Sequence, residues 1–304
     1  MTHTEKRILV NKLVMILSSL SAAVGIAFLL WILSVLVING IDAINWNIFI
    51  YEGAPPGYEE SGLKHALIGQ LILIGVSTLI GVPLGILAGA YLSEYGGLKS
   101  KLANVIRDIS DIMMSAPSIV IGVFVYAMII NRDSFLYDNW FSQNIWSGLS
   151  FSPALAGSFS GWAGIIALTI IMVPIILRTT DDMLQLVPTT LREAAFALGA
   201  PKYKVILQVV IRGAKTGILT GVLLGVARVS GETAPLLFTS FNDNFLNTDL
   251  SEPIASLTVT MFNYATSPYE DWQKLGWAAA FILSMFILGL NILGRLLLHT
   301  RKKK

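Results

Sequence analysis

Apolar residues gather along this chain in long runs that contain no charged side chain. Four such runs cover residues 14–38, 66–93, 139–177 and 275–294. Each reaches or exceeds the roughly 20 apolar residues that a helix needs to cross a hydrocarbon core about 30 Å thick. A soluble protein could bury one such segment, but several together predict an all-α integral membrane protein.

Shorter apolar runs complete the pattern and bring the expected number of transmembrane helices to six. We place these helices near residues 14–38, 66–92, 112–131, 154–177, 203–240 and 275–297. The first is longer than the apolar core of a signal peptide, which has about 7–15 residues, so we expect it to remain in the protein as a helix. The fifth is the least regular, because Arg228 and Glu232 interrupt it.

The positions of lysine and arginine predict how these helices are oriented. Six spans place both chain ends and two of the connections on one side of the membrane. Of the 21 lysines and arginines, all fall on that side except Lys64, Arg132 and Lys274, in the opposite loops, and Arg228, within a span. Basic residues concentrate on the cytoplasmic side of membrane proteins. Both termini are therefore expected in the cytoplasm, with the chain in the cytoplasmic (inner) membrane.

Composition narrows the possible chemistry. Charged residues make up 13% of the 304 residues, against roughly 25% in soluble domains. The chain has no cysteine, and its three histidines, His3, His65 and His299, are far apart, so neither thiolate chemistry nor a zinc site is expected. No phosphate-binding loop of the GxxxxGK type occurs, so the chain is not expected to be an ATPase. We expect neither an enzyme nor a cofactor bound by this chain, and no nucleic acid partner.

The second and third spans carry small residues and a proline. Gly81, Gly85 and Gly89 recur every four residues, a spacing that lets helix backbones approach closely in lipid. We expect them to pack within the bundle. The third span contains the sequence SAPS at residues 115–118. Its proline either kinks the helix or leaves a half-helix whose free N–H groups attract an anion.

A helical elbow is predicted on the cytoplasmic side, within residues 181–200. Thr190 and Glu193 have the spacing of a capping box, which would start a short helix over Leu191 to Leu198. Gly199 suits the exit from that helix, and Pro201 suits the first turn of the next one. A helix of eight residues is marginal alone, so it must pack on its own bundle or on a partner protein.

The charged pair in the fifth span is a second candidate site. Arg228 and Glu232 lie four residues apart and can pair on one face of a helix. An arginine this deep in a membrane costs roughly 3 kcal/mol and marks a functional site by default. The pair is either a structural ion pair or part of the path of an anion, since the planar fork of arginine suits phosphate. Gly231 and Pro235 are expected to break the helix beside the pair.

The elbow resembles a motif of one transporter family. Glu193, Ala194 and Ala195 are followed by Gly199, which is similar to the EAA loop of ABC importer permeases. The family often continues to a leucine-proline pair, whereas this chain has Ile211 followed by arginine. The resemblance implies that the elbow is a coupling helix seated in a groove of a cytoplasmic ATPase.

Longer strings resemble the phosphate-specific permeases within that family. They read SAPSIVIGVFVYAMI, LREAAFALGAPKYKVI, RVSGETAPLLFTSF and NILGRLL, and the resemblance extends from about residue 66 onward. It implies the type I ABC importer permease fold and phosphate as the substrate. The implied partners are a second related permease, a dimer of ATP-binding subunits that carry ATP and Mg, an extracytoplasmic phosphate-binding protein and membrane lipid.

The resemblance and the residue patterns together give two sets of site residues. We place five residues on the substrate path: Arg228, Glu232, Arg178, Ser115 and Ser118. We place five more at the contact with the ATPase: Glu193, Ala194, Ala195, Gly199 and Ala200.

The chain is expected to divide into an N-terminal part, a permease core and a basic tail. The N-terminal part covers residues 1–65, the core 66–298 and the tail 299–304. An alternative function is an ion-coupled secondary transporter or channel for an oxyanion that uses the same Arg228–Glu232 pair. The EAA elbow favours the ATP-driven importer, because a secondary transporter has no need of it. A non-transporting scaffold would leave the charge within the fifth span unexplained.

Overall fold

The computed structural model describes residues 3–58, 60–96, 100–130 and 158–300, and every regular element of this part is helical. Five helices are long and apolar enough to cross a membrane: Lys6–Ala43, Lys64–Gly96, Gly161–Gln185, Lys202–Ser230 and Glu270–Gly294. The helices Lys101–Ser115 and Ser118–Ile130 are bent by 103° at the break between them, as in a broken span or a re-entrant loop. The predicted number of six spans is reached when this bent pair is counted as one span.

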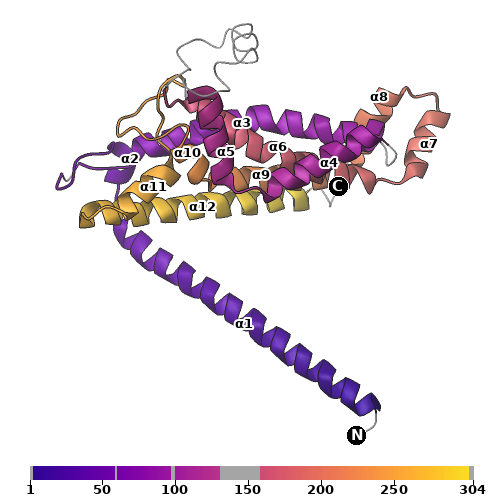
Figure 1. Ribbon diagram of the computed structural model, residues 1–304, viewed down its shortest axis with the longest axis horizontal. Coiled ribbons are helices and arrows are strands. Elements are labelled where there is room, and N and C mark those ends of the chain that lie inside the picture. Colours follow the sequence, from indigo (N-terminus) through magenta and orange to yellow (C-terminus); the bar gives the residue numbers. More distant parts are fainter. Residues whose placement is uncertain (1–2, 59, 97–99, 131–157, 301–304) are drawn as a thin grey trace.

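The elements follow one another along the chain in the order of Figure 1. Their bounds are α1 His3–Ala43, α2 Asn47–Ile50, α3 Lys64–Tyr91, η1 Leu92–Gly96, α4 Lys101–Ser115, α5 Ser118–Val125, η2 Tyr126–Ile130, α6 Gly161–Gln185, α7 Thr189–Ala197, α8 Lys202–Lys204, η5 Val205–Val210, α9 Ile211–Ser230, α10 Ala234–Leu237, α11 Leu257–Ala265 and α12 Glu270–Thr300. The three η segments are π-helical turns that continue an adjoining α-helix.

The third predicted span, 112–131, is wrong as a single helix. The predicted range begins in the last turn of α4 and crosses the break into α5. The break occurs because Pro117 has no N–H to donate and disfavours helical geometry at the residue before it. Ala116 is accordingly extended, with φ −66° and ψ 139°. The sequence left two alternatives for Pro117, a kink in one helix or the start of a separate half-helix. The structure shows a separate half-helix, α5, that begins after Pro117.

The fourth and fifth predicted spans also have corrected ends. The fourth, predicted over 154–177, begins at Gly161 and continues to Gln185, because its last charged side chains find partners on α4; residues 154–157 lie outside the described part. The fifth, predicted over 203–240, ends at Ser230. Gly231 and Pro235 end it as expected, since proline cannot donate the hydrogen bond that would continue the helix.

Helix α6 forms the centre of the bundle, with α3, α9, α4 and α5 packed around it. The largest cluster of buried apolar side chains follows α6 and includes Leu168, Met172 and Ile176. Helix α12 lies against α9 and α11. Helix α1 leaves the bundle and touches α12 only near its own C-terminal end. The most apolar part of α1 buries nothing within this chain.

Glycines bring α3 close to α6, as predicted from their spacing. A Cβ placed on Gly85 would lie 2.7 Å from the Cβ of Ile176, and one on Gly89 would lie 2.7 Å from that of Thr180. Three further glycines at the same spacing bring α9 close to an adjoining face of α6: Gly217, Gly221 and Gly225. Helix α6 thus packs closely against two glycine-lined helices.

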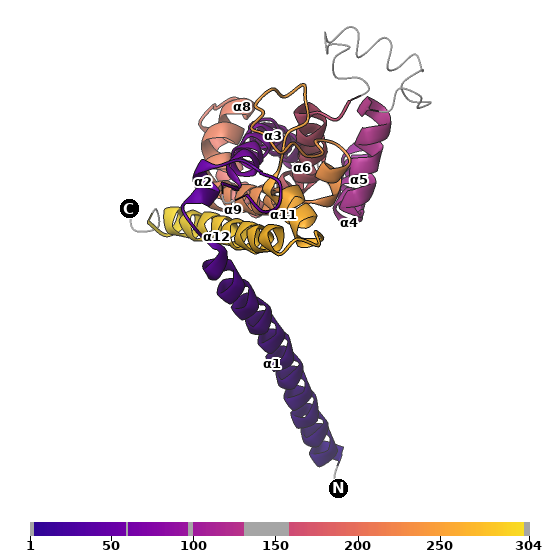
Figure 2. The same ribbon diagram turned by 90° about the vertical axis from the view of Figure 1, so that its left-hand side faces the viewer.

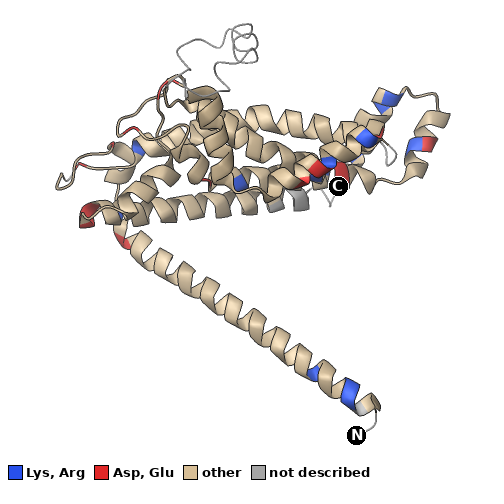
Figure 3. Cartoon of the chain, viewed as in Figure 1, with Lys and Arg blue, Asp and Glu red and all other residues tan. Residues whose placement is uncertain are grey.

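The two ends of the bundle differ. Helices α7 and α8 form one end, and α2, α10, α11 and the loops beside them form the other (Figure 1). Figure 3 shows basic side chains concentrated near α7, α8 and the free end of α1, whereas most of the length of the bundle carries no charge. We refer to the first end as the elbow end.

Candidate functional site

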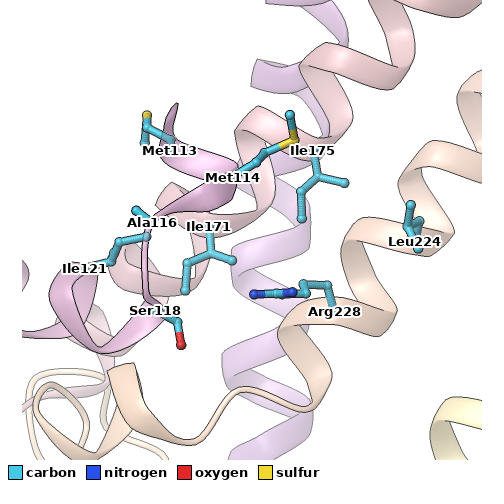
Figure 4. A pocket seen from close by; sticks show the side chains of 9 residues that line it. All are labelled: Met113, Met114, Ala116, Ser118, Ile121, Ile171, Ile175, Leu224 and Arg228. Atoms are coloured by element: carbon cyan, nitrogen blue, oxygen red, sulfur yellow. The ribbon is translucent and has the colours of Figure 1, made fainter. Parts of the chain in front are cut away.

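A pocket of about 270 Å³ opens between α4, α5, α6 and α9. Its walls are mostly apolar, and its two polar side chains are Arg228 and Ser118 (Figure 4). The remaining lining residues are Met113, Met114, Ala116, Ile121, Ile171, Ile175 and Leu224. An apolar cavity with a few convergent polar groups is the usual form of a small-ligand site.

Arg228 extends into this pocket from the last turn of α9 (Figure 4). Its Nε atom donates to Oε1 of Glu232 at 3.0 Å, which confirms the predicted pairing. The Glu232 side chain is 10% exposed and that of Arg228 is 53% exposed. Within the part of the chain that the structure describes, neither Nη atom of Arg228 has a hydrogen-bond partner. The end of the guanidinium fork is therefore free to donate to a ligand.

The end of α9 that carries Arg228 is braced by two neighbouring helices. The Nε2 atom of Gln70, on α3, donates to the carbonyl oxygen of Ser230 at 3.0 Å, and its Oε1 accepts from the N–H of Leu257 at 3.0 Å. Thr258 Oγ1 donates to the carbonyl oxygen of Glu232 at 2.9 Å. These bonds satisfy backbone groups that the broken helix would otherwise leave unpaired in a buried setting. Sequence reasoning missed Gln70, although a polar amide within the apolar run 66–93 was a usable signal.

The half-helix α5 brings Ser118 to the same pocket. Ser118 is the first residue of α5 and follows Pro117, and both it and Ala116 lie at the break. The first N–H groups of a helix have no partner within the helix and favour negative charge. Ser115 does not line the pocket, because its hydroxyl donates to the carbonyl oxygen of Ile112 at 2.8 Å. The structure therefore brings together Arg228, Glu232 and Ser118 of the predicted substrate path, but not Ser115.

Arg178 also lies outside the pocket. It is on α6, three residues beyond Ile175 in the direction of the elbow, and pairs at 3.4 Å with both Asp111 and Asp182. The three side chains are between 35% and 49% exposed. Exposed pairs of this kind contribute little to stability. Its predicted role on the substrate path stays a prediction.

A second ion pair between α4 and α6 is buried and was not predicted. Nε of Arg107 lies 2.7 Å from Oδ2 of Asp181, whose side chain is 1% exposed. The other carboxylate oxygen of Asp181 accepts from Gln185 at 2.8 Å. The pair fixes the elbow end of α4 against α6.

The elbow helix α7 is present, but its predicted start is wrong. Pro188 precedes the helix, and no side-chain hydrogen bond caps it. Thr190 lies inside the first turn rather than before it, so the capping box with Glu193 does not form. Proline fixes φ near the helical value, which allows the helix to begin at Thr189. Gly199 ends the helix with φ +76°, as predicted. Pro201 lies directly before α8 rather than in its first turn.

The predicted ATPase-contact residues lie on two faces of the elbow. Glu193, Ala194 and Gly199 are exposed. Ala195 and Ala200 are partly buried against a small apolar cluster formed by the end of α6, η5 and the start of α9. The exposed face also carries large apolar side chains, namely Leu191, Phe196 and Leu198. Exposed apolar patches on proteins mark sites of contact with another protein, a membrane or a ligand.

The elbow is tied to α3 by an arginine that sequence reasoning did not single out. Nη2 of Arg192 lies 2.7 Å from Oε1 of Glu94, in η1, and also donates to the carbonyl oxygen of Leu184 at 2.8 Å. The pair joins residues 98 positions apart in the chain. No group of three or more His, Asp or Glu side chains in the described residues could hold a metal ion.

Comparison with known proteins places the chain in a family. Residues 81–302 match the model of the binding-protein-dependent transport system inner membrane component. The phosphate transport system permease protein PstA of Haemophilus influenzae is 46% identical over 96% of this chain and 95% of its own length. The protein of the same name from Pasteurella multocida is 44% identical over 99% of both chains.

Solved structures show the same fold at low sequence identity. A chain of a bacterial alginate ABC transporter, crystallised with its alginate-bound periplasmic protein, gives a TM-score of 0.64 at 13% identity, with 95% of this chain and 94% of that chain covered. A chain of the MetNI methionine ABC transporter gives 0.59 at 18% identity, with 78% and 95% covered. The predicted ABC importer permease fold is confirmed, and the chain belongs to the family of binding-protein-dependent transport system inner membrane components.

Proposed function

We propose that this chain is the membrane-spanning permease subunit of an ATP-driven phosphate importer. The observation that carries the proposal is the pocket in which the free fork of Arg228 faces the first turn of α5. Both groups favour an anion. The names of the relatives, which align over nearly the whole chain, supply phosphate as the anion. The family is one of binding-protein-dependent transport components, so the ion-coupled alternative has no support.

The geometry suits transport better than tight storage. The two Nη atoms of Arg228 can donate parallel hydrogen bonds to two phosphate oxygens. Glu232 holds the guanidinium through Nε and offsets its charge, which weakens the attraction for the anion. A transport site must bind strongly enough to admit its substrate and weakly enough to release it.

Four surfaces fit the expected partners. The exposed face of α7 fits a groove of a cytoplasmic ATPase that binds ATP and Mg. An exposed apolar row on α4, formed by Leu102, Val105, Ile109 and Ile112, fits a second permease subunit. The loops at the end opposite the elbow fit an extracytoplasmic phosphate-binding protein. The long exposed helix α1 fits membrane lipid or the second permease.

The proposed orientation places the elbow and both termini in the cytoplasm. The free end of α1 and the C-terminal end of α12 lie toward the elbow end in Figure 1. The chain has no cysteine, so single cysteines report their own accessibility. Lys101→Cys in intact cells should resist a membrane-impermeant thiol reagent, whereas Asp249→Cys should react. The reverse labelling pattern would overturn the orientation.

The function is tested by ATP-dependent phosphate uptake into vesicles that contain the complete transporter. Arg228→Gln should lower uptake by roughly 100-fold, because a hydrogen bond to a charged group contributes about 1.5–3 kcal/mol, while the complex still assembles. The matched control is the double variant Arg228→Leu with Glu232→Leu, which removes the pair without leaving a buried charge. If the double variant assembles and transports phosphate, the pair is structural and the pocket is not the substrate path.

A further inference from the structure

The π-helix η1 receives a contact from helix α4, which carries part of the pocket. Nη2 of Arg107 donates to the carbonyl oxygen of Leu92, the first residue of η1, at 3.1 Å. The same guanidinium holds Asp181 of α6 through Nε at 2.7 Å and through Nη2 at 3.3 Å. Helix α4 is thus fixed at one point to both η1 and α6.

The same π-helix receives two contacts from the elbow. Arg192 of α7 places Nη2 2.7 Å and Nε 3.2 Å from Oε1 of Glu94. Lys202 of α8 places its Nζ 3.9 Å from the centre of the Tyr95 ring, within the range of a cation–π interaction. Three separate elements therefore meet on the five residues of η1.

The two ion pairs at this junction, Arg192–Glu94 and Arg107–Asp181, are well shielded from water. The side chains of Glu94 and Arg192 are 8% and 16% exposed, and those of Arg107 and Asp181 are 13% and 1% exposed. Breaking one partner of a buried pair leaves a charge without compensation, which is strongly unfavourable. A displacement of α7 therefore carries η1 with it more readily than it breaks the pair. π-Helical turns are rare and occur frequently at functional sites.

Helix α4 connects this junction to the pocket. Met113 and Met114, near its last residue, line the pocket, and Ser118 follows the break at Pro117. Arg107 is seven residues from Met114, which is roughly 10 Å along a helix axis. A small rotation of α4 about its anchor at Arg107 would move both methionines and the hinge before Ser118.

We propose that η1 is the junction through which movement of α7 reaches α4 and the pocket, with Glu94, Arg192 and Arg107 as its positioning residues. The inference rests on the proposed function, because it requires α7 to be moved by an ATPase. A merely structural role for the Arg192–Glu94 pair leads to a different expectation. Loss of the pair would then leave the phosphate carried per ATP by the assembled complexes unchanged, whatever the amount of complex that assembles.

The test measures ATP hydrolysis and phosphate uptake on the same reconstituted preparation of the complete transporter. In Glu94→Gln, ATP hydrolysis should remain and the phosphate carried per ATP should fall about 10-fold, within the range of about 5–150-fold typical of coupling between two sites. Asp108→Asn is the matched control. It removes an exposed carboxylate of α4, beside Arg107, that has no partner among the described residues. Its ratio should equal that of the unmodified protein.

A second variant covers the case in which Glu94→Gln fails to assemble. Arg192→Lys keeps the positive charge but loses the fork, and it should lower the same ratio. The double variant Glu94→Arg with Arg192→Glu exchanges the two charges and should restore part of the phosphate carried per ATP. An unchanged ratio in Glu94→Gln, or in Arg192→Lys if the first does not assemble, would overturn the junction. Failure of the unmodified complex to take up phosphate with ATP would instead overturn the proposed function.

Discussion

Arg228 and Arg192 each pair with a glutamate, but their guanidinium groups have different surroundings. Arg192 is 16% exposed and gives its donors to Glu94 and to two backbone carbonyls, those of Leu184 and Val187. Arg228 is 53% exposed and gives only Nε to Glu232. All three nitrogens of the first group donate hydrogen bonds inside the protein. The second keeps two donor atoms directed into a cavity.

The comparison separates a positioning contact from a binding contact. An arginine whose three nitrogens all donate within the chain holds two elements in a fixed relation, and its loss is expected to appear as lost stability or coupling. An arginine with free donors can exchange partners as a ligand arrives and leaves, so its loss is expected to appear in transport. The residue types and the chemistry of pairing are the same at both places. The number of donors left free makes the difference.

The largest effect is expected from Arg192→Leu. This change leaves Glu94, 8% exposed, without its partner, and breaking a buried pair costs about 3–5 kcal/mol. The assembled transporter should be nearly absent from the membrane, as measured by the level of the protein and its melting temperature in detergent. Lys204→Leu, at an exposed residue of α8, is the control and should assemble normally. Normal assembly of Arg192→Leu would show that Arg192 does not hold the two elements together, and the contrast with Arg228 would fail.

Arg228→Lys is expected to impair transport without loss of stability. Lysine keeps the charge but cannot donate two parallel hydrogen bonds from a planar fork, so uptake should fall about 10-fold, at the lower end of what a charged hydrogen bond contributes. The measurements are initial uptake rate at several phosphate concentrations and the melting temperature of the complex. A parallel fall in melting temperature would show that Arg228, like Arg192, is mainly structural.

Gln70→Leu tests the support behind the pocket. The change removes two hydrogen bonds and leaves the carbonyl oxygen of Ser230 and the N–H of Leu257 unpaired in a buried place. Each unsatisfied group costs about 1–3 kcal/mol. The melting temperature and the uptake rate should both fall, because the end of α9 that carries Arg228 loosens. Gln70→Glu keeps the acceptor and loses the donor, so it should retain part of both. A Gln70→Leu protein with unchanged uptake would show that α9 holds Arg228 in place without α3.

The length and spacing of apolar runs were enough to predict the fold. Within the described residues, each uncharged run contains a long helix. Gly231 and Pro235 predicted a break, and Pro117 marked a second one, because these residues act through their own backbone geometry. Helix ends were less well predicted. Helix α6 continues past Arg178 because charged side chains on another helix receive its own, which a local pattern does not contain.

The sequence predicted the charged residues of the candidate site, but not the contacts from other helices that hold them in place. Arg228 stood out because a charge within an apolar run is costly, and its partner lay one helical turn away. Gln70 is hydrogen-bonded to a residue 160 positions away in the chain, and Glu94 is paired with a residue 98 positions away. Such contacts depend on how helices pack, which spacing along one segment does not determine. Arg192 was counted only as a basic residue of the cytoplasmic side.

The smallest effect is expected from Thr190→Ala, at the elbow. The sequence pattern made Thr190 a helix cap, and loss of a cap costs about 1 kcal/mol. In the structure Thr190 is the second residue of α7, is exposed, and caps nothing. Its replacement should therefore change stability by no more than about 0.5 kcal/mol and should leave uptake unchanged.

The contrast for Thr190 is a serine that does cap a helix. Ser160 precedes α6, is fully buried, and accepts from the N–H of Ala163 at 3.3 Å. Ser160→Ala should cost about 1 kcal/mol, so the two alanine variants should differ in melting temperature when measured side by side in the same complex. An equal loss in both would mean that α7 begins where the capping-box pattern places it, and that Pro188 does not set its start.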